Sequence, residues 1–325
     1  MNLTNYISQG QYRYYYDQLT NKDKALYKQI LDGFMTFQES MMLSTGDIDR
    51  VLDVYHKICY DVPEIFFVKK LKYRPGMSIE LLVEYRFTPQ ECLGIFEVMD
   101  EKCQKLKALT AGMGDVEKVK AGHDYLVHHV TYRDVGAPYS HEAAGPLVYD
   151  IGVCEGISKA FKYIADRIGL KAIVVSGMAT GEGNPNGGGH AWNVVEVDGK
   201  LYHLDVTFDS GLSKNGAARY DYFLLSAEEI SADHCEDPGQ PICSHVYNYY
   251  ATVGCLAEGK RDVVKMVSGM KSGESVVFQM PQIPAPEEEI VNAVWKAVQD
   301  AMPQSEYKML MYHNKERRVF QLNKE

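Results

Sequence analysis

The sequence predicts an α+β protein in which a helix packs on an antiparallel sheet, with a smaller α+β unit on either side. Three observations predict it. Residues 152–171, GVCEGISKAFKYIADRIGLK, carry apolar side chains at helical spacing and end near a glycine. Two β-rich runs then flank Asp198-Gly199, a dipeptide typical of a two-residue hairpin turn. On both sides of this region, helix-like and strand-like patterns alternate over short distances.

Residues 1–110 are expected to form the first unit. Apolar residues recur at helix-like intervals over residues 12–60 and predict two helices there. The runs IFFVKKLKY and IELLVEYRF predict two strands, because Arg74-Pro75-Gly76 between them is a turn signal. Thr88-Pro89 then predicts the start of a helix that continues to about Leu109.

Residues 111–255 are expected to form a core and residues 256–325 a C-terminal α+β unit. The glycine-containing stretch 110–114 separates the first unit from an amphipathic helix that carries Val119 and Leu126. Glycines punctuate the chain after residue 255. The tail pattern predicts a strand at 276–280, a proline-rich linker, a helix at 287–301 and two strands around His313-Asn314.

Composition narrows the function classes. Of 325 residues, 46% are hydrophobic and 24% charged, as in ordinary globular proteins. The formal charge of -10, with scattered basic residues, argues against a nucleic-acid partner. No apolar run approaches the roughly 18 residues of a membrane span. The sequence therefore predicts a protein without nucleic-acid partner or membrane segment.

Cysteine usage and the first residues favour the cytoplasm. Seven cysteines are an odd number without a CxxC pair, which favours a reduced compartment. The start MNLTNYISQGQYRYYY lacks the basic and apolar regions of a signal peptide. A chain beginning at a mature N-terminus would have the same appearance, so export stays open.

Cys154 falls in the first turn of the predicted helix. The positive end of the helix dipole and free backbone N–H groups at that point favour a thiolate, the nucleophilic form of cysteine. The same N–H groups could form part of an oxyanion hole. Cys154 also lies three residues before Ile157 and so equally continues the buried stripe as a small core residue.

The hairpin places His190 and Asp205 together. If Asp198-Gly199 closes the turn, paired positions sum to 397, and His190 and Asp205 become diagonal neighbours on one face. Diagonal neighbours are about 7–8 Å apart, within reach of an imidazole–carboxylate hydrogen bond. The opposite face is expected to carry apolar residues, including Leu204, Val206 and Phe208. A polar pair here indicates either a catalytic histidine or a structural His–Asp pair.

These motifs together resemble the transglutaminase-like superfamily, in which a Cys, a His and an Asp follow one another on a papain-type fold. The resemblance covers residues 115–250 through GVCEG, HAWN, DGKLYHLD and TFD, with HDYLVHHVTY upstream and YDYFLLS downstream. It implies a Cys-His-Asp catalytic triad in which Cys154 is the nucleophile, His190 its general base and Asp205 the carboxylate that orients the imidazole. Two weaker candidates accompany the triad: Tyr149 as an oxyanion or substrate residue, and Trp192 as a wall of the substrate groove.

The resemblance implies a cysteine peptidase or amide acyltransferase that acts on peptide or protein substrates and needs no cofactor. A thioester on Cys154 leads to hydrolysis if water attacks and to transamidation if an amine attacks. Deglycosylation also occurs in the superfamily. A peptidase or amide hydrolase is favoured here over a crosslinking enzyme. The alternative is a module that binds peptides or proteins on this fold without turnover.

Two other interpretations stay open from the residues themselves. His190, His203 and Asp205 share a face, so a metal site is a second possible chemistry. The residues His234, Cys235, Cys243 and His245 fit no known ligand spacing and are expected in a surface loop. The glycine-rich segment 181–189 is expected to be a mobile loop at the mouth of the site.

Overall fold

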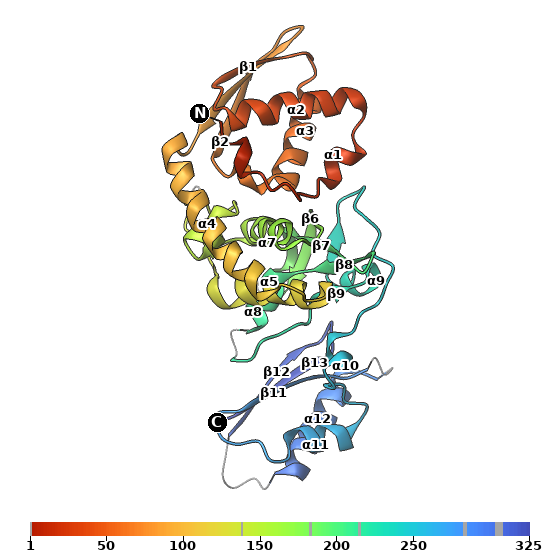
Figure 1. The fold of residues 1–325 in the computed structure, drawn as a ribbon. Helices are drawn as coiled ribbons and strands as arrows, with labels where there is room; N and C mark the ends of the chain where they lie inside the picture. Colours follow the sequence, from red (N-terminus) through yellow and green to blue (C-terminus); the bar gives the residue numbers. More distant parts are fainter. Residues whose placement is uncertain (1, 138, 182–183, 214–215, 282–284, 303–307) are drawn as a thin grey trace.

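The computed structural model of the chain describes residues 2–137, 139–181, 184–213, 216–281, 285–302 and 308–325. Helices combine with mainly antiparallel sheets in three successive parts along the molecule, and the two chain ends lie in the two outer parts (Figure 1). The fold class is therefore α+β, as the sequence predicts.

The first part packs helices on a three-stranded sheet of order β1-β3-β2. Strands β2 and β3 pair around the predicted turn, and Thr88 with Glu91 forms the capping box that begins α4. The two expected helices are α2 and α3. The sequence did not predict β1, which lies between them in the chain and pairs with β3. The elements of this part are η1 (Thr4–Tyr6), α1 (Tyr14–Gln18), α2 (Asn21–Met35), β1 (Ser40–Leu43), α3 (Ile48–Asp61), η2 (Pro63–Ile65), β2 (Val68–Arg74), β3 (Ile79–Tyr85) and α4 (Pro89–Leu109).

The middle part packs α7 against a five-stranded sheet of order β10-β6-β7-β8-β9. Helix α7 is buried along nearly its whole length and ends at Gly169, whose φ of 77° suits a glycine at a helix terminus. The elements are α5 (Asp115–His129), β4 (Thr131–Tyr132), α6 (Ala144–Val148), β5 (Ile151–Gly152), α7 (Cys154–Ile168), β6 (Ala172–Gly181), β7 (Asn184–Val197), β8 (Lys200–Leu204), α8 (Val206–Ser213), β9 (Phe223–Leu225), α9 (Ala227–Ile230), β10 (His234–Glu236) and α10 (Tyr249–Thr252).

The β7–β8 hairpin has the predicted register. Asn193 pairs with Leu204 and Val197 with Lys200, so paired positions sum to 397. Asp198 and Gly199 both have positive φ, 50° and 75°, which is the conformation that a tight two-residue hairpin turn requires. The one-residue parity on which the site prediction rests is therefore confirmed.

Two expectations near this hairpin are wrong. The expected mobile loop at 181–189 is strand from Asn184 onward, because backbone hydrogen bonds extend β6 and β7 without needing apolar side chains; residues 182–183 lie outside the described residues. The second strand ends at Leu204, so Val206 and Phe208 belong to helix α8 instead. Phe208 consequently packs against His190, with ring centroids 5.1 Å apart.

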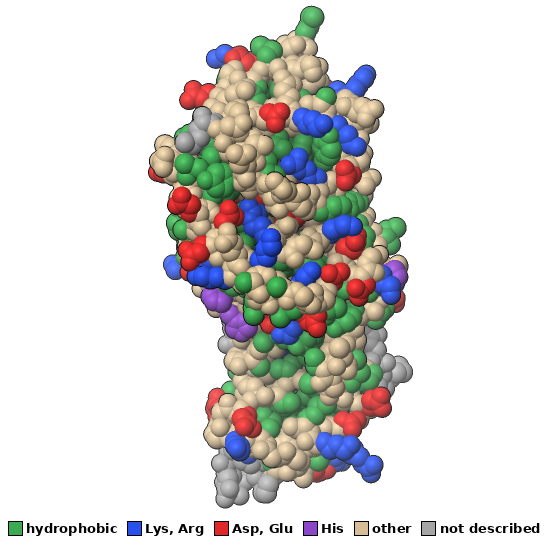
Figure 2. All heavy atoms as spheres, in the orientation of Figure 1, with side chains coloured by type: hydrophobic (Ala, Val, Ile, Leu, Met, Phe, Trp, Pro, Cys, Tyr) green, Lys and Arg blue, Asp and Glu red, His purple; other side chains and the backbone are tan. Residues whose placement is uncertain are grey.

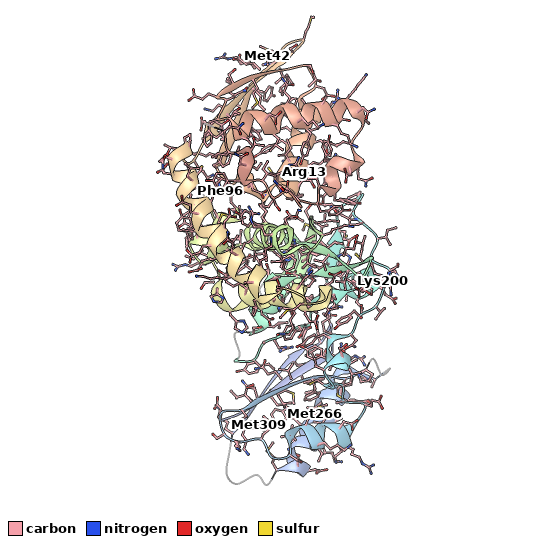
Figure 3. All side chains as sticks on the ribbon, viewed as in Figure 1. Arg13, Met42, Phe96, Lys200, Met266 and Met309 are labelled. Carbon is pink, nitrogen blue, oxygen red and sulfur yellow. The ribbon has the colours of Figure 1, made fainter. Side chains whose placement is uncertain are left out.

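The C-terminal part is a second three-stranded sheet, of order β11-β13-β12, covered by two helices. Met266 on α11 and Met309 on β12 lie at this end of the molecule, whereas Lys200 marks the hairpin of the middle part and Met42 lies at the far end, on β1 (Figure 3). The elements are α11 (Lys260–Val267), β11 (Ser275–Gln279), α12 (Glu287–Ala301), β12 (Met309–Asn314) and β13 (Val319–Lys324).

Hydrophobic packing is continuous between the first two parts and reaches the third. One cluster of buried side chains extends from Leu3 through Phe161 to Tyr250 and includes Val319 on β13, while Val294 and Phe320 belong to a second cluster in the C-terminal part. The division at residues 110 and 255 into three folding units stays a prediction.

Acidic and basic side chains are interspersed on the face shown in Figure 2, without a large patch of one sign. Among the helices that the structure describes, none combines the length and the apolar character needed to cross a membrane.

Candidate active site

Cys154 is the first residue of α7, preceded by Val153 as N-cap. The backbone near Ser140 packs directly on the first turn of α7, since a side chain at Gly156 would meet the carbonyl oxygen of Ser140 at 2.3 Å. The Ser158 hydroxyl fixes the helix start to the sheet by donating to the carbonyl oxygens of Cys154 (2.8 Å) and Ala191 (3.0 Å). The thiol is partly buried at the positive end of the helix, as predicted.

His190 and Asp205 are hydrogen-bonded, with 2.6 Å between His190 Nε2 and Asp205 Oδ2. Asp205 follows the last residue of β8, and its Oδ1 accepts the backbone N–H groups of Thr207 (2.8 Å) and Phe208 (3.0 Å). The carboxylate thus caps the N-terminus of α8, which fixes its position independently of the histidine.

The thiol of Cys154 lies next to His190. Because Asp205 occupies Nε2, the second ring nitrogen, Nδ1, is left for the contact with the thiol, and the Ala191 N–H also points to the sulfur. The structure therefore brings Cys154, His190 and Asp205 into one line of contacts, in the order that the sequence analysis predicted.

The charges in this line reinforce one another. Burial opposes ionisation of Asp205, but the adjacent His190 and His234 hold the pKa of its carboxyl well below its usual range. Burial likewise opposes the charged form of His190, yet the Asp205 carboxylate and the thiol raise the pKa of the imidazole to about 10. Burial raises the pKa of the Cys154 thiol, but the hydrogen bond and charge of His190 outweigh it, and that pKa is lowered overall. Both shifts favour the thiolate–imidazolium pair over the neutral pair.

Comparison with known proteins finds one family in this part of the chain. Residues 105–206 match the family model of the transglutaminase-like superfamily, and this segment contains all three residues. Residues 105–206 form a transglutaminase-like core. The kyphoscoliosis peptidases of Mus musculus and Homo sapiens are 27% and 26% identical to this chain over 140 residues, 38% of the chain. The match spans only about a fifth, 21%, of the length of these curated relatives.

Solved structures are similar to part of the chain at low identity. A structure described as a TGase is 19% identical, with a TM-score of 0.30, and covers 43% of this chain and 44% of its own. The periplasmic domain of TgpA from Pseudomonas aeruginosa is 15% identical, with a TM-score of 0.29, and covers 43% of this chain and 58% of its own.

The two weaker candidates have different surroundings from those expected. Tyr149, at the end of α6, stacks on Tyr139 with ring centroids 3.9 Å apart, and its oxyanion role stays a prediction. Trp192 is only 1% exposed, so it offers little surface to a substrate. Its ring instead lies under His190, nearly parallel at 18°, and its Nε1 donates to His203 Nδ1 (3.1 Å). Trp192 therefore packs beneath the transglutaminase-like site rather than forming a groove wall.

The sequence analysis missed Tyr132, whose side chain interacts with the Cys154 thiol. Strand β4 pairs in parallel with β5, so that Tyr132 faces Gly152, two residues before the cysteine. A two-residue parallel pairing leaves no local pattern, and nothing in HHVTYRD could have indicated it.

His234 was misassigned. The sequence analysis expected His234 and Cys243 in a surface loop, but both are buried, and His234 lies on β10, which pairs with β6. Its Nε2 is 3.0 Å from Asp205 Oδ2. The only local signal was the His–Cys dipeptide in a short strand next to a charged residue.

The side chains that could hold a metal ion differ from those expected, because His234 takes the place of His203. His203 contacts Trp192 and lies 2.8 Å from Glu236, away from the expected set with His190. Within the described residues, donor atoms of His190, Asp205 and His234 lie within 4.8 Å of one another. Two hydrogen bonds, of 2.6 and 3.0 Å, already account for this proximity.

A depression of about 510 Å³ lies elsewhere, at the C-terminal end of α7. Its lining includes Gln104, Lys107, Arg167 and Gly169, and none of the three residues of the transglutaminase-like site. Its size does not make it the reaction site. Burial raises the pKa of Cys103, the cysteine in its lining, to about 12, so that thiol is a poor nucleophile at neutral pH.

Proposed function

We propose that this protein is a thiol enzyme that acts on amide bonds of peptides or proteins through a thioester on Cys154. The observation that supports it best is the contact of a helix-start cysteine with an imidazole that is itself hydrogen-bonded, at 2.6 Å, to a buried carboxylate. A nucleophile, a base and a group that orients the base are the three parts that such chemistry needs.

In the proposed reaction, the Cys154 thiolate attacks the carbonyl carbon, and the carbonyl electron pair moves onto oxygen. Backbone N–H groups in the first turn of α7 would stabilise that oxyanion. His190 then donates its Nδ1 proton to the leaving amine, the C–N bond breaks and a thioester remains. Water attacks the thioester after giving a proton to His190, and the thiolate and the imidazolium are restored with release of a carboxylic acid.

We propose hydrolysis as the main outcome of the thioester. The curated relatives are named peptidases, which supports this choice over crosslinking. A primary amine in place of water would give transamidation from the same intermediate, so the two outcomes are separated by the product alone.

The test is mass spectrometry of the full-length protein with a panel of peptides and p-nitroanilides, with lysine-containing peptides as amine acceptors. The wild type should form an acyl adduct on Cys154 and release acid. Cys154→Ala should reduce turnover at least 10³-fold, and Cys154→Ser nearly as much, because a neutral hydroxyl is a weaker nucleophile. Cys255→Ala, at another partly exposed cysteine, is the matched control and should retain activity. Wild-type turnover in Cys154→Ala would refute the proposal.

A further inference from the structure

His234 is held between two carboxylates. Its Nδ1 lies 2.6 Å from Asp233 Oδ1 and its Nε2 3.0 Å from Asp205 Oδ2, and the residue is only 4% exposed. The second of these oxygens is the one that also accepts the hydrogen bond of His190. One carboxylate oxygen therefore binds two imidazoles.

Both carboxylates have the surroundings of ionised groups. Asp205 accepts two backbone N–H groups on its other oxygen. Asp233 accepts the Tyr222 hydroxyl on Oδ2 (2.5 Å) and lies 3.2 Å from Arg317 Nη2 on Oδ1. An ionised carboxylate only accepts hydrogen bonds, so both ring nitrogens of His234 must carry protons to make these two contacts.

We propose that His234 is a positioning residue of this site: a buried imidazolium that shares the Asp205 carboxylate with His190 and limits how strongly that carboxylate holds the His190 proton. The effect on Cys154 rests on the proposed function, whereas the charge of His234 does not. The pKa of His234 agrees in direction, since burial lowers it but Asp205 and Asp233 raise it overall.

The charged and titratable groups around His234 come from four elements or their edges. Asp205 precedes α8, Asp233 precedes β10, His190 lies on β7 with ring centroids 5.4 Å apart, and Tyr222 precedes β9 at 5.7 Å. Two carboxylates favour the cation and His190 opposes it when protonated. Because two positive charges at this distance repel, the His234 cation should lower the pKa of His190 by roughly one unit relative to Asp205 acting alone.

Aromatic rings and a closely packed strand enclose this arrangement. The Trp192 and Phe208 rings lie against the His234 ring, with centroids 5.0 and 4.7 Å away. Strand β10 lies so close to β6 that a side chain at Gly177 would meet the Cys235 carbonyl oxygen at 2.1 Å. Arg317, on the turn between β12 and β13, brings a charge from the C-terminal part to Asp233.

The first experiment measures the charge of His234 directly, by ¹⁵N NMR of the protein with labelled histidine. The sample is kept at pH 8 with a metal chelator, so that no metal ion occupies the ring nitrogens. His234→Gln identifies the resonances. Both His234 ring nitrogens should be protonated, and Asp233→Asn should convert the ring to a neutral tautomer. A neutral His234 in the wild type overturns the proposal, whatever the chemistry of Cys154.

The second experiment measures the effect on His190 by alkylation of Cys154 with iodoacetamide across pH, followed by peptide mapping. In His234→Gln the amide still fills the site and donates to Asp205, but the charge is lost. The upper step of the alkylation profile, which reports loss of the His190 proton, should move up by about one pH unit. Asp233→Asn should move this step in the same direction. An unchanged step, or a downward shift, overturns the proposal.

His123→Gln is the matched control. His123 is also buried between two carboxylates, Asp124 (3.0 Å) and Asp209 (3.1 Å), but it lies on α5, and its two ring nitrogens contact these carboxylates instead of Asp205. Its substitution should cost comparable stability and leave the alkylation profile unchanged. If Cys154 of the wild type shows no selective alkylation, the proposed function fails, while the NMR result still decides the charge of His234.

Discussion

At the scale of single residues, the site depends on how each charge is compensated in a buried setting. Asp205 is fully buried, yet it accepts two side-chain and two backbone hydrogen bonds. This saturation stabilises the ionised carboxylate, which in turn stabilises the protonated form of His190. The thiolate of Cys154 is then favoured by the imidazolium and by the helix N-terminus together.

Tyr132 provides a test at this scale. Its hydroxyl is placed to donate to the Cys154 sulfur and so to stabilise the thiolate. Tyr132→Phe should raise the pKa of Cys154 by a few tenths of a unit, because a neutral hydrogen bond contributes about 1 kcal/mol or less. The pH dependence of Cys154 alkylation measures this shift.

Tyr149→Phe is the matched control for Tyr132→Phe. Its ring stacks on Tyr139, with ring centroids 3.9 Å apart, so the substitution removes a tyrosine hydroxyl from a different stacked pair. The alkylation profile should be unchanged. Equal shifts in both variants would mean that Tyr132 has no specific contact with the sulfur.

At the scale of elements, the sequence could predict those parts of the site that local patterns determine. The helix-start cysteine follows from one amphipathic stripe, and the His190–Asp205 hydrogen bond follows from the parity of one hairpin. Tyr132 and His234 reach the site through the β4–β5 and β10–β6 pairings, whose partners are about 20 and 57 residues apart in the chain. Such long-range pairings leave no local periodicity. The end of β8 was also beyond prediction, since VTFD fits a strand as well as the first turn of a helix capped by Asp205.

The hairpin turn gives the prediction for this scale. Inserting one alanine between Asp198 and Gly199 should shift the register of one strand and turn its side chains to the opposite face. His190 and Asp205 would then separate, and the low-pH reactivity of Cys154 should fall at least tenfold. Alkylation at pH 6 with peptide mapping measures it.

The control is a one-residue insertion after Gly76, in the β2–β3 turn of the first part. It alters an antiparallel hairpin with a longer turn, in the first part of the molecule, so the reactivity of Cys154 should be retained. Retained reactivity after the insertion at Asp198-Gly199 as well would contradict the role given to hairpin register.

At the scale of the whole molecule, the two outer parts meet the middle part through buried charges. Arg86, which follows β3, pairs with Glu142 (3.3 Å), and Glu142 pairs with Lys159 of α7 (3.1 Å). Arg317 pairs with Asp233 from the C-terminal side. We propose that the outer parts support the site and shape access to it, without supplying a group that reacts.

Arg317→Gln tests this supporting role. The side chain is 5% exposed and also donates to the Glu229 carbonyl oxygen, so its loss leaves Asp233 less compensated in a buried setting. The free energy of unfolding should fall by about 3 kcal/mol in urea denaturation. Cys154 alkylation at pH 7 should stay within about threefold of the wild type, since Arg317 touches no reacting atom.

Lys315→Gln, at an exposed position on the same turn, should change stability by no more than about 0.5 kcal/mol. A loss of Cys154 reactivity in folded Arg317→Gln as large as that in Asp205→Asn would mean that the C-terminal part contributes directly to the reaction.

The central claim is that Asp205 acts on Cys154 through His190, and the pH dependence of Cys154 alkylation in Asp205→Asn tests it most directly. The amide fills the same space but cannot stabilise an imidazolium, so the pKa of His190 should fall from about 10 toward or below its ordinary value. In the wild type, Cys154 should react at a pH well below that of the other six cysteines, and in Asp205→Asn this low-pH reactivity should be lost. An identical alkylation profile in the two proteins would contradict the account, because Asp205 would then have no electrostatic contact with the thiol–imidazole pair.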